Sequence, residues 1–148
     1  MLTAAVMGTF WVPAKDGFPE AFAMYRRHYT ARNRRPKREL MIGPGEKMVL
    51  AGFFREAVFC WQKQKKRDDA QYGVNCTVFR NESASRSSDM ILEAMLWAWS
   101  RWPGERLFTF IDPRKVKSRN PGYCFKCAGW KLCGKSKSGK IILDFMPQ

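Results

Sequence analysis

The sequence predicts a mixed α+β domain, a mostly antiparallel sheet with flanking helices. Short runs of β-branched and aromatic residues recur along the chain, separated by Gly, Pro and Ser turns. Two longer segments, 18–29 and 88–102, instead have the length and spacing of helices. With 148 residues, 45% of them hydrophobic, the whole chain (1–148) is expected to form one domain with a substantial core.

The first half predicts one helix and four strands. A strand over 7–12 is expected to stop at Pro13. The helix over 18–29 has Phe18, Phe22, Tyr25 and Tyr29 on one apolar face. Runs at 47–51, 57–62 and 74–79 predict three consecutive strands, the first two joined as an antiparallel hairpin. These runs therefore predict an antiparallel meander.

The second half predicts a buried helix packed against the centre of the sheet. The segment 88–102 is apolar nearly all round, and Ser87 or Ser88 is expected to cap it. The short apolar run 107–111 is compatible with an inner, parallel strand. A short helix follows the turn Asn120-Pro121-Gly122, and strands at 130–133 and 141–145 close the domain as a hairpin.

A net charge of +14 predicts a polyanionic partner, with DNA as the first candidate. The basic residues are clustered, because one acid-free segment within 26–38 holds seven of them and a second cluster follows Asp112. The alternatives are a disordered arm for the first cluster and a solvated surface for the second. The predicted DNA-binding residues are Arg26, Arg27, Arg32, Arg34, Arg35, Lys37, Arg38, Arg114, Lys115, Lys117 and Arg119.

The order of strand, polar loop and buried helix around residues 74–102 resembles the donor half of GNAT-type acyltransferases. The segment Phe125-x-x-x-Gly129-Trp130 is similar to the closing motif of that superfamily. Within the superfamily, the chain is most similar to the phage Mom proteins, which modify adenine in DNA. This resemblance covers roughly residues 20–135. It rests on His28-Tyr29, on Arg80-Asn81-Glu82-Ser83, and on Asp112-Pro113 with Gly122, Tyr123 and Trp130.

The resemblance implies a GNAT-like fold with a splayed central sheet, and an acyl-CoA or related acyl donor beside the fourth strand. A helix start offers free backbone N–H groups to a pyrophosphate. The implied donor-binding residues are Val78, Phe79, Arg80, Asn81, Ser83, Ser85, Arg86, Ser87 and Ser88. One departure is that this loop has no glycine, where ordinary members of the superfamily have several. A plain polar loop before a capped helix is the other interpretation.

The candidate catalytic residues are His28, Tyr29, Asp112 and Tyr123. A lone histidine can act as a base near neutral pH, a tyrosine can protonate a leaving group, and Asp112 can orient a histidine or hold an amine. Many GNAT enzymes have the acidic tyrosine where this chain has Phe125, so a tyrosine acid here would be Tyr123. The competing interpretations are a helix-terminal cation for His28 and simple packing for Tyr123.

The function expected from these residues is transfer of a small acyl-derived group to adenine in DNA. The alternatives are a GNAT acetyltransferase acting on a protein or small amine, and a non-catalytic basic module that binds nucleic acid. No metal site is predicted, since Cys124, Cys127 and Cys133 include only one CxxC pair. The sequence has no run of 18 uncharged apolar residues, so no membrane span is expected. We expect a cytoplasmic, phage- or prophage-encoded protein with free thiols.

Overall fold

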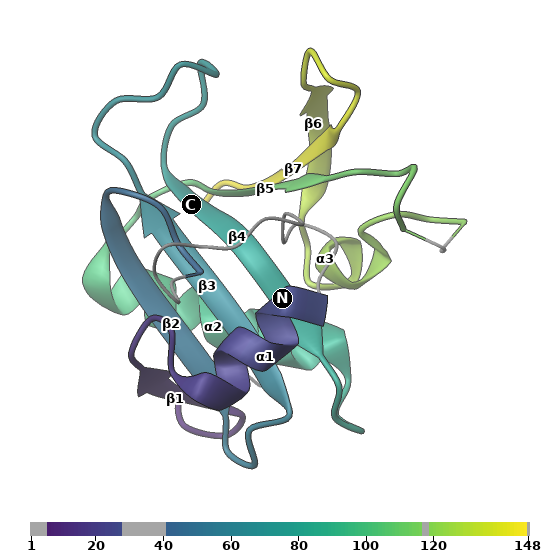
Figure 1. Cartoon of the computed structure of the whole chain (residues 1–148). Helices are drawn as coiled ribbons and strands as arrows, with labels where there is room; N and C mark the ends of the chain where they lie inside the picture. The colour runs from purple at the N-terminus through teal and green to yellow at the C-terminus, as the bar shows by residue number, and fades with distance from the viewer. Residues whose placement is uncertain (1–5, 28–40, 117–118, 148) are drawn as a thin grey trace.

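The computed structural model describes residues 6–27, 41–116 and 119–147. In these residues seven strands and three helices alternate in an α+β order (Figure 1). The first half holds β1 (Trp11–Ala14), α1 (Pro19–Arg27), β2 (Glu46–Gly52), β3 (Ala57–Lys63) and β4 (Val74–Asn81). The second half holds α2 (Ser87–Arg101), β5 (Leu107–Ile111), α3 (Tyr123–Cys127), β6 (Lys131–Lys135) and β7 (Ile141–Phe145).

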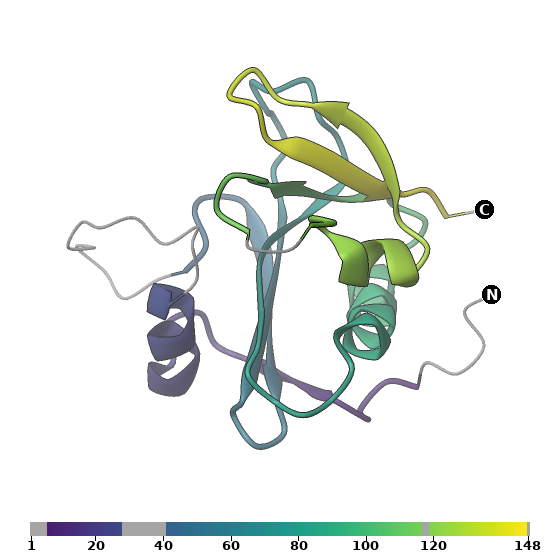
Figure 2. The same cartoon turned by 90° about the vertical axis from the view of Figure 1, so that its right-hand side faces the viewer.

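The strands form one open sheet in the order β1-β2-β3-β4-β5-β7-β6. Five of its six pairings are antiparallel, and β4–β5 is parallel. A parallel pair needs a crossover connection, and α2 supplies it. Seen along the sheet, α1 covers one face, whereas α2 and α3 lie on the other (Figure 2). The predicted α+β class with a mostly antiparallel sheet is therefore confirmed.

The parallel pairing between β4 and β5 is short. It joins three residue pairs, from Val74 with Leu107 to Cys76 with Thr109, although both strands continue further. The ladder ends where the Thr109 hydroxyl donates a hydrogen bond of 2.9 Å to the carbonyl oxygen of Cys76. Beyond this point the two strands line a cavity instead of pairing with each other.

A β-bulge interrupts β4 at Thr77. Opposite β3, Cys60 pairs with Val78 and Trp61 pairs with Cys76, so Thr77 is the extra residue. The bulge changes which side chains face which layer. Cys76 packs in the core beneath α2, whereas Val78 packs in the smaller core beneath α1. One strand thus contributes to both hydrophobic layers.

The long apolar helix is buried against the sheet, as its composition predicts. Met90, Ile91, Ala94, Met95 and Ala98 of α2 are all buried. Two core tryptophans satisfy their indole N–H groups on this helix: Trp11 donates to the Met90 carbonyl at 2.8 Å and Trp61 to the Ala94 carbonyl at 3.0 Å. These bonds orient bulky rings that would otherwise bury an unpaired donor.

Glu93 is a buried carboxylate in the middle of α2, with a relative exposure of 1%. It accepts hydrogen bonds from the backbone N–H groups of the segment before β1 and from an indole of its own helix. These donors, at 2.7–3.2 Å, are Gly8, Thr9, Phe10, Trp11 and Trp97 Nε1. Because several donors share one carboxylate, Glu93 links residues 8–11 to α2.

Three sequence-based predictions of local structure need correction. The first strand begins at Trp11 rather than Met7, and it contains Pro13, which an edge strand tolerates because one of its sides has no ladder to complete. The residue that precedes α2 is Arg86, without a side-chain cap, since the Ser87 hydroxyl accepts a bond from Asn81 instead. The first strand of the closing hairpin is Lys131–Lys135 rather than 130–133.

Candidate functional site

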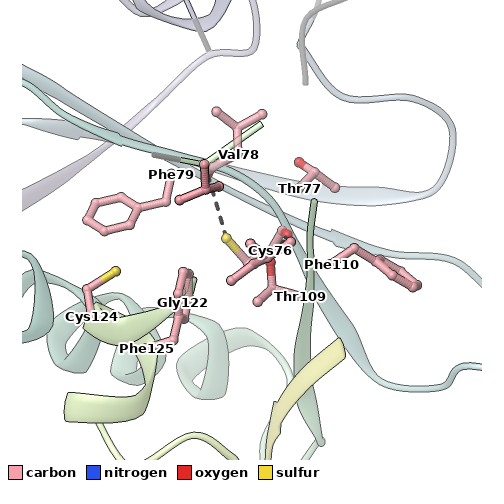
Figure 3. Close-up of a pocket in the computed structure, with 11 residues that line it drawn as sticks. Cys76, Thr77, Val78, Phe79, Thr109, Phe110, Gly122, Cys124 and Phe125 are labelled. Atoms are coloured by element: carbon pink, nitrogen blue, oxygen red, sulfur yellow. Dashed lines mark hydrogen bonds between the residues drawn. The ribbon is translucent and has the colours of Figure 1, made fainter. Parts of the chain in front are cut away.

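A cavity of about 210 Å³ lies where β4 and β5 separate. Figure 3 shows side chains from β4, β5 and the α3 region arranged around it. Its wall is mostly apolar, and it opens at the end of the three-residue parallel pairing. The lining residues are Cys76, Thr77, Val78, Phe79, Thr109, Phe110, Ile111, Val116, Gly122, Cys124 and Phe125.

Gly122 is required for the close approach of the α3 region to this cavity. Its φ is +78°, in the region that disfavours side chains, and a Cβ there would collide with the side chains of Leu143 and Ile111. Phe125 follows on α3 and packs edge-on against Trp130, with ring centroids 4.8 Å apart. The glycine and this aromatic pair hold α3 close to the separated strands.

Two threonines give the cavity its polar side chains, and they differ in their hydrogen bonding. The Thr109 hydroxyl is already used, since it donates to Cys76. The Thr77 hydroxyl is buried and has no hydrogen-bond partner among the described residues. A buried polar atom without a partner costs free energy, so a ligand that bonds to Thr77 would recover it. Neither threonine stands out in the sequence, because the bulge that presents Thr77 depends on the register with β3.

The polar loop after β4 is closed by its own hydrogen bonds. The Asn81 amide donates to the Ser85 carbonyl at 2.8 Å and to the Ser87 hydroxyl at 3.0 Å. Its side-chain oxygen accepts from both the backbone N–H and the hydroxyl of Ser83, and the Ser83 hydroxyl in turn accepts from the Ser85 N–H. Asn81 therefore shapes this loop in the way that an Asx turn does. Asn81 occupies the backbone N–H of Ser83 and the Ser83 hydroxyl occupies that of Ser85, two donors that a phosphate would use.

Glu82 pairs with two cations beside the loop. Its carboxylate accepts from Arg27 at 2.7 and 2.8 Å and from Arg80 at 2.6 Å. These hydrogen bonds lower the pKa of Glu82 to about 2, and the bonds from Arg27 have a larger effect than the bond from Arg80. Glu82 is therefore ionised at neutral pH and holds Arg80, which the sequence predicts as a phosphate ligand. Arg86, by contrast, is exposed and has no carboxylate partner among the described residues.

The start of α2 adds backbone donors to this region. The N–H groups in the first turn of a helix have no partner inside the helix, so Ser87 and Ser88 present donors at its positive end. Val78 and Phe79 line the cavity, and the strand they belong to leads directly into the loop. The predicted donor-binding residues thus follow one path from the cavity, through the loop, to the helix start.

Asp112 lies directly after β5, and its side chain is 5% exposed. It accepts from the Arg114 backbone N–H and Nε, both at 3.0 Å, and from a terminal nitrogen of the same guanidinium at 3.3 Å. These hydrogen bonds with Arg114 lower the pKa of Asp112. Its neighbour Ile111, rather than Asp112, lines the cavity.

Tyr123 begins α3 and is 61% exposed. Interaction with the Cys127 thiol, one turn further along the helix, raises the pKa of Tyr123, whereas the charge of Arg86 acts in the opposite direction. Tyr123 does not line the cavity, although Gly122 and Cys124 on either side of it do. The structure therefore places Tyr123 beside Cys127 and within the electrostatic influence of Arg86, while the hydrogen bonds of Asp112 go to Arg114.

Several predicted residues lie outside the part of the chain that the structure describes. They are His28, Tyr29, Arg32, Arg34, Arg35, Lys37, Arg38 and Lys117. Of the remaining predicted DNA-binding residues, Arg26 and Arg27 are exposed at the end of α1, and Arg114, Lys115 and Arg119 are exposed between β5 and α3. The resemblance implies that the strand from Cys76 to Arg80 lies along the donor, but Cys76, Thr77, Thr109 and Cys124 were not predicted as individual site residues. Neither the strand positions nor the α3 position of Cys124 carries a motif that would identify them.

The cysteines occupy different environments. Cys76 and Cys124 both line the cavity. Burial raises the pKa of each of these two thiols. Cys127 and Cys133 are exposed. Within residues 6–27, 41–116 and 119–147, no group of three or more His, Cys, Asp and Glu side chains is arranged to hold a metal ion.

In the described chain, no helix has the length and apolar character needed to cross a membrane. Comparison of the chain with known proteins gives no match to a family model, a curated protein or a solved structure.

Proposed function

We propose that this protein is a GNAT-like group transferase that uses an acyl-CoA or related acyl donor to modify adenine in DNA, in the manner of the Mom proteins. The observation that supports this most is the separation of the parallel strands β4 and β5 around a cavity, next to a polar loop and a helix start. A ligand with a narrow apolar-walled arm and a phosphate end fits this succession. The resemblance of the strand, loop and helix order to GNAT-type acyltransferases supports the same proposal, as does the excess of basic residues.

The proposed chemistry is attack by the exocyclic amine of the base on the carbonyl carbon of the donor thioester. A C–N bond forms, the C–S bond breaks, the amine loses one proton, and the leaving thiolate gains one. The products are the acylated amine and free CoA, so no further reactant is required. The protein must therefore position the two partners, accept one proton and donate another.

The candidate residues divide between these tasks. Tyr123 is suited to protonate the thiolate, because a phenol carries its proton at neutral pH. Asp112 is suited to accept a hydrogen bond, because its lowered pKa keeps it ionised. His28 is the proposed proton acceptor. Tyr29 is proposed to offer an aromatic surface on which the adenine stacks. Phosphate would be held by Arg86 and the first amides of α2.

DNA is the proposed acceptor because basic residues end α1 next to the loop that follows β4. Arg26 and Arg27 end α1, and Arg27 contacts Glu82 in the loop beside the cavity. The basic segment that follows, through Arg38, continues from there in the sequence. Phosphate contacts by such residues bring affinity without sequence preference. The proposal places the protein in the cytoplasm of a bacterial cell, where phage DNA and acyl donors meet.

The direct test is mass spectrometry of nucleosides from bacterial DNA, with and without expression of the protein. An adenine derivative of increased mass, found only with the intact protein, is the expected result. Unmodified DNA from cells that contain folded protein would count against the adenine proposal. Labelled acetyl-CoA incubated with the protein and candidate amines would then test the alternative acetyltransferase.

A second candidate function is a non-catalytic basic module that binds nucleic acid. The closure of the loop by its own side chains favours it, since Asn81, Glu82 and Ser83 occupy groups that a donor phosphate would need. Isothermal titration with acetyl-CoA separates the two functions. Binding at the cavity supports the transferase, whereas DNA binding without any affinity for acetyl-CoA supports the module.

Replacing Thr77 with valine should leave the fold intact and weaken acetyl-CoA binding. Valine keeps the size of the side chain and removes an unpaired buried hydroxyl, so stability is expected to be unchanged or slightly higher. Loss of one neutral hydrogen bond to the ligand, worth about 1 kcal/mol, corresponds to roughly fivefold weaker affinity.

The matched control for this substitution is Thr109→Val in the same cavity. Its hydroxyl bonds to the Cys76 carbonyl, so this variant should lose about 1 kcal/mol of stability instead. Calorimetry gives the affinity, and urea denaturation gives the stability. Equal affinity of the wild-type protein and Thr77→Val would show that the ligand does not bond to Thr77.

Replacing Glu82 with glutamine should increase the affinity for acetyl-CoA by about two- to fivefold. The change releases Arg80 and Arg27 from the carboxylate that pairs with both, so that Arg80 can turn to a phosphate. The control is Glu20→Gln, which makes the same charge change on the exposed surface of α1. If both variants bind acetyl-CoA equally well, the effect is one of net charge and Arg80 has no local role.

A further inference from the structure

The C-terminal part of the chain carries a basic surface that extends beyond the predicted DNA-binding cluster of residues 114–119. Between residues 113 and 143 there is no Asp or Glu, although nine Lys and Arg residues occur there. This acid-free stretch is longer than the one within 26–38, and most of it is described by the structure. In Figure 1 the turn between β6 and β7 projects from the end of the sheet, away from α1 and α2.

Backbone hydrogen bonds define the conformation of the turn between β6 and β7. The Ser136 N–H donates to the Lys140 carbonyl at 2.8 Å, and the Gly139 N–H donates to the Ser136 carbonyl at 3.0 Å. The Arg114 guanidinium then donates to the Ser138 carbonyl at 3.0 Å. That contact joins the turn to the loop after β5, so that the basic residues of both segments belong to one surface.

The charge on this surface is not neutralised within the described chain. The carboxylates nearest to it are occupied: Asp144 pairs with Arg106 at 2.8 Å, and Asp112 pairs with Arg114 at 3.0 Å. Lys115, Lys135, Lys137 and Lys140 have no carboxylate partner among the described residues. Closely spaced cations without counterions inside the protein attract a polyanion from outside it.

Lysines on an edge strand have another explanation, because they discourage pairing with a second sheet. That explanation covers Lys131 and Lys135 on the edge strand β6. It does not cover Lys137 and Lys140, which lie in the turn between the strands. These two lysines are therefore the residues that distinguish a binding surface from edge protection.

We propose that the β6–β7 turn, with Lys137 and Lys140, binds the phosphate backbone of DNA. This inference rests on DNA as the acceptor in the proposed function, and it adds a second contact at the opposite end of the sheet from α1. The turn carries no aromatic side chain for a base, so its contribution is to affinity and orientation rather than to sequence recognition.

The test is fluorescence anisotropy with a short labelled DNA duplex at salt concentrations between about 50 and 200 mM. The double variant Lys137→Ala, Lys140→Ala is compared with Lys65→Ala, Lys66→Ala, which removes the same charge from an exposed loop elsewhere. Each lost phosphate contact should reduce the slope of log affinity against log salt by about 0.9. We expect a reduction of about 1.8 for the turn variant and a wild-type slope for the control.

A turn variant with the slope of its control would overturn the inference, whether or not both bind more weakly than the wild type. That outcome would leave DNA as the partner and move the contact elsewhere. A wild-type protein without DNA affinity would instead contradict the DNA acceptor in the proposed function. Circular dichroism establishes that both variants are folded.

Discussion

Replacing Glu93 with alanine is expected to reduce the free energy of unfolding by about 3–5 kcal/mol. The carboxylate accepts bonds from several donors in a buried setting, and each charge-assisted bond contributes about 1.5–3 kcal/mol. Alanine leaves those N–H groups without their acceptor and leaves a cavity that water can fill only in part. Urea denaturation followed by circular dichroism measures the loss.

Two further variants identify the cause of this effect. Glu93→Gln keeps the volume but turns an N–H₂ group toward backbone N–H donors, so its loss should be intermediate. Asp89→Ala removes a carboxylate from the exposed first turn of the same helix and should cost less than about 1 kcal/mol. A loss below about 1 kcal/mol for Glu93→Ala would mean that water replaces the carboxylate. If water does not replace the carboxylate, hydrogen exchange at the backbone amides of Thr9 and Phe10 should accelerate.

Replacing Tyr123 with phenylalanine is expected to reduce DNA modification by roughly 10²–10⁴-fold, the usual contribution of a positioned acid. The side chain is 61% exposed and phenylalanine keeps the ring, so the fold should be unaffected. DNA affinity and acetyl-CoA affinity should stay near the wild-type values. Full activity of the variant would exclude this phenol as the proton donor.

The pH dependence provides a second test of Tyr123. A step that needs the protonated phenol is lost as the pH rises through its pKa, which the Cys127 thiol raises above the ordinary value of about 10. Replacing Cys127 with alanine removes the leading cause of that increase. The alkaline loss of activity should then begin at lower pH than in the wild-type protein. An unchanged alkaline limb would assign the proton to another group.

Much of the fold could be predicted from periodicity and turn residues. The strand over 107–111 was predicted at its observed bounds, and the predicted hairpin of 47–51 and 57–62 corresponds to β2 and β3. These elements are defined by local patterns of apolar residues and by the turns between them. The α+β class followed from their order.

The features that shape the site could not be predicted in this way. The bulge at Thr77 depends on how β4 aligns with β3, and that alignment is a property of two segments rather than one. The partners of Glu93 are backbone amides, which have no side-chain signature in a sequence. Glu82 pairs with Arg80 two positions before it and also with Arg27, 55 positions earlier, and this second, distant partner has no signal in the local sequence.

The attachment of the first strand to α2 sets an order on the assembly of the chain. The amides of residues 8–11 are synthesised 82–85 residues before their carboxylate partner. At roughly 5–20 residues per second on the ribosome, they wait about 4–17 seconds for it. During that interval β1 can pair with β2 but lacks its anchor to the helix. The contact between the first strand and α2 can therefore form only after residue 93 has been synthesised.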